Sequence, residues 1–272
     1  MKKLLITCMM IALVAVLAAC GGKDKNVSND EKSITIGATA GPYSDMLKKA
    51  IIPGLEEKGY KVELKEFSDY IQPNQALANG EIHANLFQNT VYLDNVVKEN
   101  NFELSKLINV PTAPMGIFSN KFKSIEEITD GSKITLPNDP VNAARALIIL
   151  QDEGLIEFDP NIEILKASEK DVTVNHKNLK FLPIESGQLP RSVESTDLAA
   201  VPGNFALSAG MDLLDALALE NMPDQYRNVV AVKTENLDKQ FAKDIKEIVE
   251  SAQFEKVIDE EFQGFGKPEW MK

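Results

Sequence analysis

The strongest binding chemistry in this sequence of 272 residues is an arginine placed just inside an expected helix. The stretch 137–140 reads Pro-Asn-Asp-Pro and precedes a helix pattern from Val141 to Asp152, in which Asn142 and Arg145 share one face. Helix N-terminal amides and a guanidinium both bind anions. The stretch therefore predicts a site for a small carboxylate. Two plainer interpretations remain: a salt bridge for Arg145 and a helix cap for Asp139.

Aromatic side chains gather in a second stretch, residues 68–93. Tyr70 and Tyr92 follow the ends of expected strands and Phe87 is the last residue of one, at the place where open α/β folds bind ligands, and Asn89 lies among them. We expect no neighbouring carboxylate that would pair with a cationic ligand side chain. A thioether interacts well with aromatic rings. The stretch indicates either an enclosure for an apolar, sulfur-containing side chain or a set of core aromatics.

A third candidate stretch combines residues 187–192 with residues 200–206 at another strand-to-helix entry. Asn204 is its candidate binding residue. Arg191 is expected to pair with an acidic neighbour rather than with a ligand.

The residues that catalysis needs are scarce in this chain. Its two cysteines, Cys8 and Cys20, both fall in the first twenty residues, and its two histidines, His83 and His176, lie far apart. No zinc-protease, hydrolase or phosphate-loop motif occurs. We therefore expect a protein that is not an enzyme, with no metal site and no cofactor.

The elements that must position these candidates alternate between strand and helix patterns, which favours an α/β fold with parallel sheets. Strands are expected at 33–38, 60–67, 84–87, 132–136, 179–184, 197–201 and 229–233, and helices at 43–58, 74–78, 90–99, 141–152 and 237–262.

The length and the order of elements suggest two lobes. Expected crossings between the lobes lie at 110–114 and near 226–229. Lobe 1 would then comprise residues 31–113 plus 229–272, and lobe 2 residues 114–228.

The N-terminus carries the features of an export signal. Lys2 and Lys3 precede an uncharged, mostly apolar run that is too short to span a membrane comfortably. The run ends in Leu17-Ala18-Ala19-Cys20, which resembles a bacterial lipobox, although an ordinary signal peptide with an incidental cysteine is the alternative. We expect a signal peptide at 1–19, lipidation of Cys20 and a flexible tether at 20–32. The protein would then be anchored to the lipid bilayer on the extracytoplasmic face of the cell membrane.

Composition limits the possible partners. The formal net charge of −12 becomes −14 when Lys2 and Lys3 leave with the signal peptide. An acidic surface repels phosphate backbones, so nucleic-acid binding is not expected. A tethered, extracytoplasmic protein with two α/β lobes instead suggests a solute-binding protein that closes on its ligand.

At these same residues the chain resembles the NlpA lipoprotein family of methionine-binding proteins. Matching blocks occur at 69–74, 84–88, 137–145 and 188–192. The resemblance implies a two-lobed, type II periplasmic-binding-protein-like fold that delivers L-methionine to the membrane and ATPase subunits of an ABC transporter. It also implies that Tyr70, Phe87 and Tyr92 surround the ligand side chain, that Arg145 binds its carboxylate and that Asn142 supports Arg145.

The sequence departs from the family pattern at several positions. Asn89 stands where the family usually has His, Val91 where it often has Pro, and Tyr43 where it has His. Pro202 replaces an expected Asn, with Asn204 nearby. A methionine derivative or a dipeptide such as Gly-Met is therefore an alternative ligand, and a surface adhesin or signalling lipoprotein is an alternative of another class. We expect a monomer.

Overall fold

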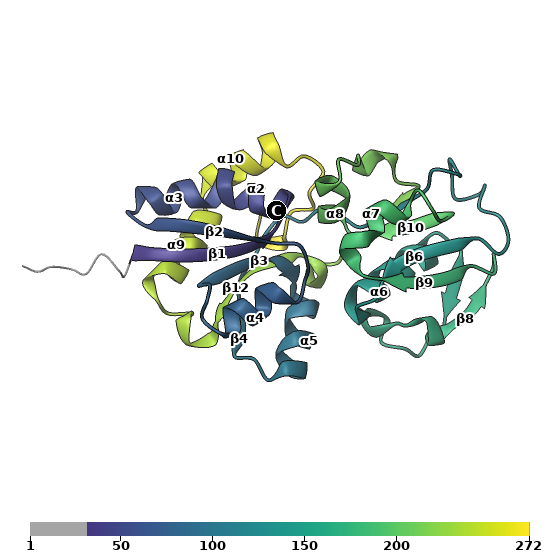
Figure 1. Cartoon of the computed structure of the whole chain (residues 1–272), viewed down its shortest axis with the longest axis horizontal. Coiled ribbons are helices and arrows are strands. Elements are labelled where there is room, and N and C mark those ends of the chain that lie inside the picture. Colours follow the sequence, from purple (N-terminus) through teal and green to yellow (C-terminus); the bar gives the residue numbers. More distant parts are fainter. Residues whose placement is uncertain (1–31, 272) are drawn as a thin grey trace, which may run out of the picture. The chain divides into compact units, whose positions relative to one another are not determined.

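The computed structural model describes residues 32–271, which contain two five-stranded sheets and one two-stranded sheet (Figure 1). Residues 34–272 group into one compact unit. The predicted signal peptide, Cys20 and all but the last residue of the predicted tether lie outside the described residues.

The first sheet combines strands from both ends of the chain in the order β2-β1-β3-β12-β4. Strands β1 and β3 are parallel, whereas β12 is antiparallel to both of its neighbours. The strands are β1 (Ser33–Thr39), β2 (Lys61–Phe67), β3 (Ala84–Asn89), β4 (Leu104–Asn109) and β12 (Asn228–Lys233).

The second sheet takes all its strands from the middle of the chain, in the order β11-β5-β10-β6-β9. Strand β6 runs parallel to β9 and β10, and β5 is antiparallel to β10 and β11. A separate antiparallel pair joins β7 to β8. The strands are β5 (Gly116–Phe118), β6 (Lys133–Pro137), β7 (Ile156–Phe158), β8 (Val172–Asn175), β9 (Lys180–Ile184), β10 (Leu198–Val201) and β11 (Ala218–Leu219).

Helices cover both faces of each large sheet (Figure 1). On the first sheet, α2, α3, α9 and α10 pack on one face, and α4 and α5 on the other. On the second sheet, α6 packs on one face, and α7 and α8 on the other. The helices are α2 (Pro42–Met46), α3 (Ile52–Glu57), α4 (Gln72–Ala78), α5 (Thr90–Asn100), α6 (Pro140–Asp152), α7 (Leu189–Ser192), α8 (Gly203–Ser208), α9 (Gln240–Val249) and α10 (Ala252–Glu261).

Two expectations about these elements are wrong. The sheets are mixed rather than parallel, because β5 and β12 each begin after the chain has passed from one sheet to the other and join antiparallel to their neighbours. The single helix expected at 237–262 is two helices. Ser251 separates them, because its hydroxyl accepts a hydrogen bond from the backbone N–H of Phe254 and caps α10.

The helical segment expected at 43–58 is confirmed but contains an irregular turn. A π-helical stretch, Leu47–Ile51, lies between α2 and α3. Pro53 follows within the first turn of α3 and supplies no N–H, which explains why the regular hydrogen-bond ladder is interrupted there. The segment nevertheless keeps one apolar face, since Met46, Leu47 and Leu55 are all buried.

The first passage between the sheets runs from β4 to β5, and helix α8 packs closely against it. A Cβ atom at Gly203 would lie 2.3 Å from the carbonyl oxygen of Pro114. Only glycine permits this approach, so the start of α8 can lie directly against the passage. The C-terminal segment also reaches this passage, because Thr112 forms an antiparallel bridge with Gly266.

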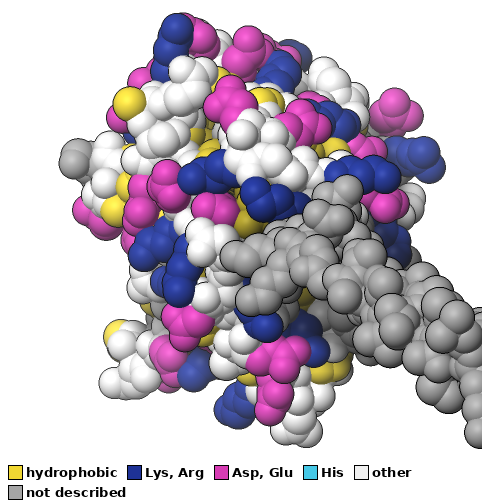
Figure 2. Space-filling view, turned by 90° about the vertical axis from the view of Figure 1, so that its left-hand side faces the viewer, with side chains coloured by type: hydrophobic (Ala, Val, Ile, Leu, Met, Phe, Trp, Pro, Cys, Tyr) yellow, Lys and Arg dark blue, Asp and Glu magenta, His cyan; other side chains and the backbone are white. Residues whose placement is uncertain are grey.

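Charged side chains of both signs cover the surface. Figure 2 shows Lys and Arg side chains interspersed with Asp and Glu on the face that it presents. Exposed ion pairs such as Lys48–Glu66, at 2.8 Å, contribute little to stability but keep the surface solvated. No helix within residues 32–271 has the length and apolarity needed to cross a membrane.

Candidate functional site

A small cavity brings together residues from the two large sheets and from the passage between them. Its empty space, including the mouth, is about 340 Å³. The first sheet and its helices contribute aromatic and amide side chains, and the second contributes the starts of α6 and α8. The lining residues are Tyr43, Tyr70, Phe87, Gln88, Asn89, Tyr92, Thr112, Ala113, Asn142, Arg145, Pro202, Gly203, Asn204 and Asn228.

One wall of the cavity is aromatic. The ring centroid of Tyr70 lies 5.8 Å from that of Phe87 and 6.0 Å from that of Tyr92, and the centroids of Phe87 and Tyr92 are 6.2 Å apart. Phe205, from α8, lies 5.0 Å from Tyr70. Burial raises the pKa of the Tyr70 and Tyr92 hydroxyls, so both remain neutral donors. The three rings therefore lie together along the cavity, and they also pack as core.

The end of β3 positions this wall. Phe87 is buried on β3, and the side chain of Asn89 accepts a 2.8 Å hydrogen bond from the backbone N–H of Tyr92, which caps α5. Behind the wall, a buried amide network holds Gln88 against Asn74 through hydrogen bonds of 2.6 and 2.7 Å. Asn85 joins the same network. The strand end is therefore fixed by side-chain amides as well as by its backbone ladder.

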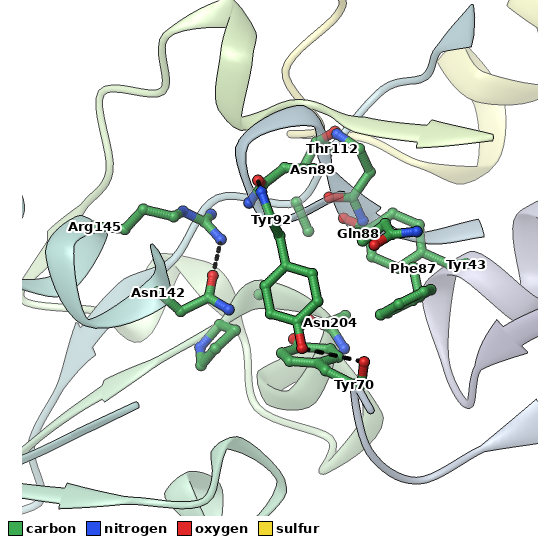
Figure 3. A pocket seen from close by; sticks show the side chains of 14 residues that line it. Tyr43, Tyr70, Phe87, Gln88, Asn89, Tyr92, Thr112, Asn142, Arg145 and Asn204 are labelled. Carbon is green, nitrogen blue, oxygen red and sulfur yellow. Dashed lines mark hydrogen bonds between the residues drawn. The ribbon is translucent and has the colours of Figure 1, made fainter. Parts of the chain in front are cut away.

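The opposite wall is polar and centres on Arg145 in α6. In the view of Figure 3, Arg145 and Asn142 lie on one side of Tyr92, with Phe87, Gln88 and Tyr43 on the other. Nη1 of Arg145 donates to Oδ1 of Asn142 at 2.8 Å. The amide nitrogen of Asn142 in turn donates to the carboxylate of Asp139, at 3.1 and 3.0 Å. Asp139 also caps α6, as predicted.

A buried glutamate holds the other edge of the guanidinium. Nε and Nη2 of Arg145 donate to Oε1 and Oε2 of Glu220 at 2.8 and 2.6 Å. The backbone N–H of Met115 also donates to Glu220. Burial favours a neutral Arg145, but the carboxylate more than offsets it and the pKa of the guanidinium is raised. The salt-bridge interpretation of Arg145 is therefore correct in part, with a partner that the sequence did not reveal.

Arg145 keeps capacity for a ligand despite these contacts. A guanidinium has five N–H donors. Three of them are used by Glu220 and Asn142. Two donors, one on each terminal nitrogen, remain for a carboxylate. The ring of Tyr226 lies behind the guanidinium, 5.5 Å from its central carbon, and supports it by a cation–π contact.

Asn204 contacts the aromatic wall and retains a free donor. Its Oδ1 accepts a 2.7 Å hydrogen bond from the Tyr70 hydroxyl. Its Nδ2 is buried without a hydrogen-bond partner. An unpaired buried donor is costly, and an acceptor on a bound ligand would satisfy it.

All seven predicted binding residues line this one cavity: Tyr70, Phe87, Asn89, Tyr92, Asn142, Arg145 and Asn204. Arg191 is exposed and does not line it. Sequence reasoning missed Tyr43, Thr112 and Asn228 as lining residues. Tyr43 lies at a helix start and departs from the family pattern, whereas Thr112 and Asn228 have no sequence signal beyond lying in an expected passage and next to an expected strand.

Nothing in the described part of the chain points to a metal centre. Among residues 32–271, no three His, Cys, Asp or Glu side chains come together in a way that could hold a metal ion. His83 has a structural role, since its Nδ1 accepts a 3.0 Å hydrogen bond from the backbone N–H of Thr35.

Comparison with known proteins covers nearly the whole chain. The sequence profile described as NlpA lipoprotein matches residues 34–270. The probable D-methionine-binding lipoprotein MetQ of Vibrio cholerae is 31% identical, over 98% of both chains. The methionine-binding lipoprotein MetQ of Bacillus subtilis is 32% identical, over 97% of both chains.

A solved structure gives the same picture in three dimensions. A nutrient-binding protein from Burkholderia cenocepacia, bound to methionine, superposes with a TM-score of 0.80 and 34% identity. The match covers 85% of this chain and 97% of that chain. The order of the elements, the cavity between the two sheets and the match along the sequence agree, and the chain belongs to the NlpA lipoprotein family.

Proposed function

We propose that this protein captures a small amino acid, with L-methionine the leading candidate, and delivers it to an ABC importer. The observation that carries the proposal is the division of one cavity into an aromatic wall and a polar wall that ends in two free donors of Arg145. A zwitterionic amino acid with an apolar, polarisable side chain fits both walls. Relatives named as methionine-binding lipoproteins support the choice of methionine.

The size of the cavity favours a single amino acid. Its empty space is about 340 Å³ even with the open mouth counted, so the space enclosed between the two walls is small and favours a small ligand over a large one. A dipeptide would have to widen it. The protein acts by binding and release, so we propose no catalytic step.

A second candidate is the same role with a methionine derivative or a Gly-Met-like dipeptide. The specific observation is that Asn89 and Pro202, both departures from the family pattern, line the cavity. Asn89 has its Oδ1 committed to capping α5. An additional polar group on the ligand could reach its remaining amide donors or those of Asn204.

The ligand is tested on protein stripped by unfolding and refolding. Titration calorimetry and thermal shifts should show saturable, concentration-dependent binding of L-methionine, as mass action requires. Gly-Met and methionine sulfoxide serve as the derivative arm. Binding of only lysine, glutamate or a sugar would contradict the aromatic-wall argument, and the identity of any small molecule released on unfolding gives an independent answer.

The proposed architecture follows from this role. Residues 31–113 plus 229–272 would form one lobe and residues 114–228 the other, closing on the ligand as a monomer. A signal peptide at 1–19, a lipidated Cys20 and a tether at 20–32 would hold them at the extracytoplasmic face of the membrane. The importer's membrane and ATPase subunits would be the partners.

Cys20→Ser tests the anchor. Without the sulfur that accepts the lipid, we expect the chain to be released from membranes or left unprocessed, because stable anchoring needs the acyl chains. Cell fractionation and the mass of the mature N-terminus measure this, with Cys8→Ser as the matched control. Firm membrane attachment and normal processing of Cys20→Ser would exclude a lipid anchor at this position.

A further inference from the structure

Within residues 32–271, Glu220 is the one acidic group with direct hydrogen bonds to Arg145, yet it does not line the cavity. It directly follows β11, and its side chain is only 3% exposed, against 7% for Arg145. Two charge-assisted hydrogen bonds to Arg145 and one from the Met115 backbone fix its orientation. The pair therefore behaves as one rigid, desolvated unit.

This pairing decides the charge that the cavity presents to a ligand. Arg145 is the only charged side chain among the lining residues, and Glu220 cancels its formal charge. Asp139 adds a further carboxylate, which Asn142 links to the same guanidinium. The polar wall thus offers directed N–H donors but no excess positive charge.

The consequence differs between two kinds of carboxylate ligand. A carboxylate with no positive group of its own would add an uncompensated negative charge to this buried cluster, which a low-dielectric site disfavours. A zwitterion brings an ammonium group that compensates its own carboxylate. Oxygens of the lining amides can accept its hydrogen bonds.

We propose that Glu220 makes this cavity selective for net-neutral, zwitterionic amino acids over the corresponding carboxylate anions. The inference rests on the proposed amino-acid binding function and goes beyond it, because it assigns the discrimination to a residue outside the cavity lining. A site built on an unpaired arginine would bind both kinds of carboxylate.

The test compares two probes that differ at one group: L-methionine and its hydroxy acid analogue, in which a hydroxyl replaces the ammonium. Affinities are measured by calorimetry at neutral pH on the full chain purified in detergent. The preference for methionine is the ratio of the two dissociation constants. The hydroxy acid lacks the ammonium and its hydrogen bonds, which lowers its affinity by the same factor in the wild type and in a variant. This factor therefore cancels when the methionine preference of the wild type is compared with that of the variant.

Glu220→Gln removes the negative charge and keeps the size of the side chain. We expect the preference for methionine to fall by roughly tenfold or more, mainly because the hydroxy acid binds more tightly to an unneutralised Arg145. Glu220→Asp is the matched control. It keeps the charge but shortens the reach, so both ligands should bind more weakly while the preference stays within about threefold of the wild type.

Three results would overturn the proposal. An unchanged preference in Glu220→Gln would mean that Glu220 only positions Arg145. A collapse of the preference in Glu220→Asp would mean that geometry, not charge, sets it. Equal affinity of the wild type for the two probes would show that the selectivity does not exist. This measurement uses only the wild type and so does not depend on whether a variant folds. If the wild type binds neither probe, the proposed function fails as well, which separates that outcome from the other three.

Discussion

The two walls of the cavity are built in different ways. The aromatic wall, on the first sheet, is made of side chains that pack like any core: Tyr70, Phe87 and Tyr92 lie within about 6 Å of one another. The polar wall, on the second sheet, depends on a few short, directed contacts around Arg145. Area and shape define the first wall, and charge and geometry define the second.

This difference implies different tolerances. Apolar packing is non-directional and degrades gradually, whereas a buried charge that loses its partner has no favourable alternative. We therefore expect the polar wall to fail abruptly on substitution and the aromatic wall to fail in proportion to the surface lost. The following substitutions examine that contrast from the largest expected effect to the smallest.

Arg145→Ala should have the largest effect on both binding and stability. Breaking a buried ion pair costs about 3–5 kcal/mol because the remaining charge, here Glu220, is left unpaired. Ligand affinity should fall by roughly thirtyfold or more. Arg145→Lys should restore only part of it, since Lys lacks the planar fork. Calorimetry and denaturant unfolding measure the two effects.

Arg191→Ala is the matched control, because it removes the same charge from an exposed position outside the cavity. It should leave both the ligand affinity and the free energy of unfolding nearly unchanged. Equal affinity of Arg145→Ala and Arg191→Ala would place the carboxylate site elsewhere.

Phe87→Ala should weaken the aromatic wall. Phe87 is 3% exposed, and truncating a buried Phe typically costs about 3–5 kcal/mol of stability. Binding should also fall, because the ligand loses one aromatic neighbour. Phe122→Ala, at a buried position in the core of the second sheet, should lose comparable stability and leave the affinity unchanged. Equal ligand affinity in Phe87→Ala and Phe122→Ala would argue that the ligand does not touch the aromatic wall.

Tyr70→Phe removes a single hydrogen bond that joins the two walls, from the Tyr70 hydroxyl to Asn204. A bond of this kind contributes about 0.5–1.5 kcal/mol. We expect small-angle scattering to show that closure needs a higher ligand concentration. Tyr60→Phe is the control. The Tyr60 hydroxyl donates to Asp244, and both residues belong to the first sheet and its helices, so this bond does not join the two walls of the cavity. Closure should be unaffected there, and an effect as large as that of Tyr70→Phe would show that the contact with Asn204 is not special.

Asp139→Asn should have the smallest effect, visible mainly as a change with pH. Burial raises the pKa of Asp139 above its ordinary value of 3.8, so the unfolded chain loses this proton before the folded chain does. The wild type should therefore lose stability relative to Asp139→Asn as the pH rises from below 3.8 through the folded-state pKa. Asn preserves a capping oxygen. Unfolding curves at several pH values measure the difference in the free energy of unfolding between the wild type and Asp139→Asn. If the wild type gained stability relative to Asp139→Asn as the pH rose, the raised pKa of Asp139 would be contradicted.

Local patterns were enough to predict most of the elements. The alternation at residues 60–67 and the helix signals around Asp139 correspond to β2 and α6. Strands β4, β5, β7, β8 and β11 were missed: β4 does not alternate clearly, and the other four have only two to four residues, too few for a pattern to show. The pairing directions were also wrong, since β12 takes its neighbours from residues more than a hundred positions earlier, and no local signal specifies that choice.

The sequence by itself determined which residue types can bind and where each local turn or helix begins. Asn142 and Arg145 share a face because of helical spacing, and Phe87 and Asn89 follow from the end of one strand. Only the tertiary structure decided that these groups face one cavity and that Glu220, seventy-five positions after Arg145, neutralises it. The physical reason is range: spacing along a helix or strand is fixed by backbone geometry, whereas partners across two sheets are selected by burial and charge over the whole fold.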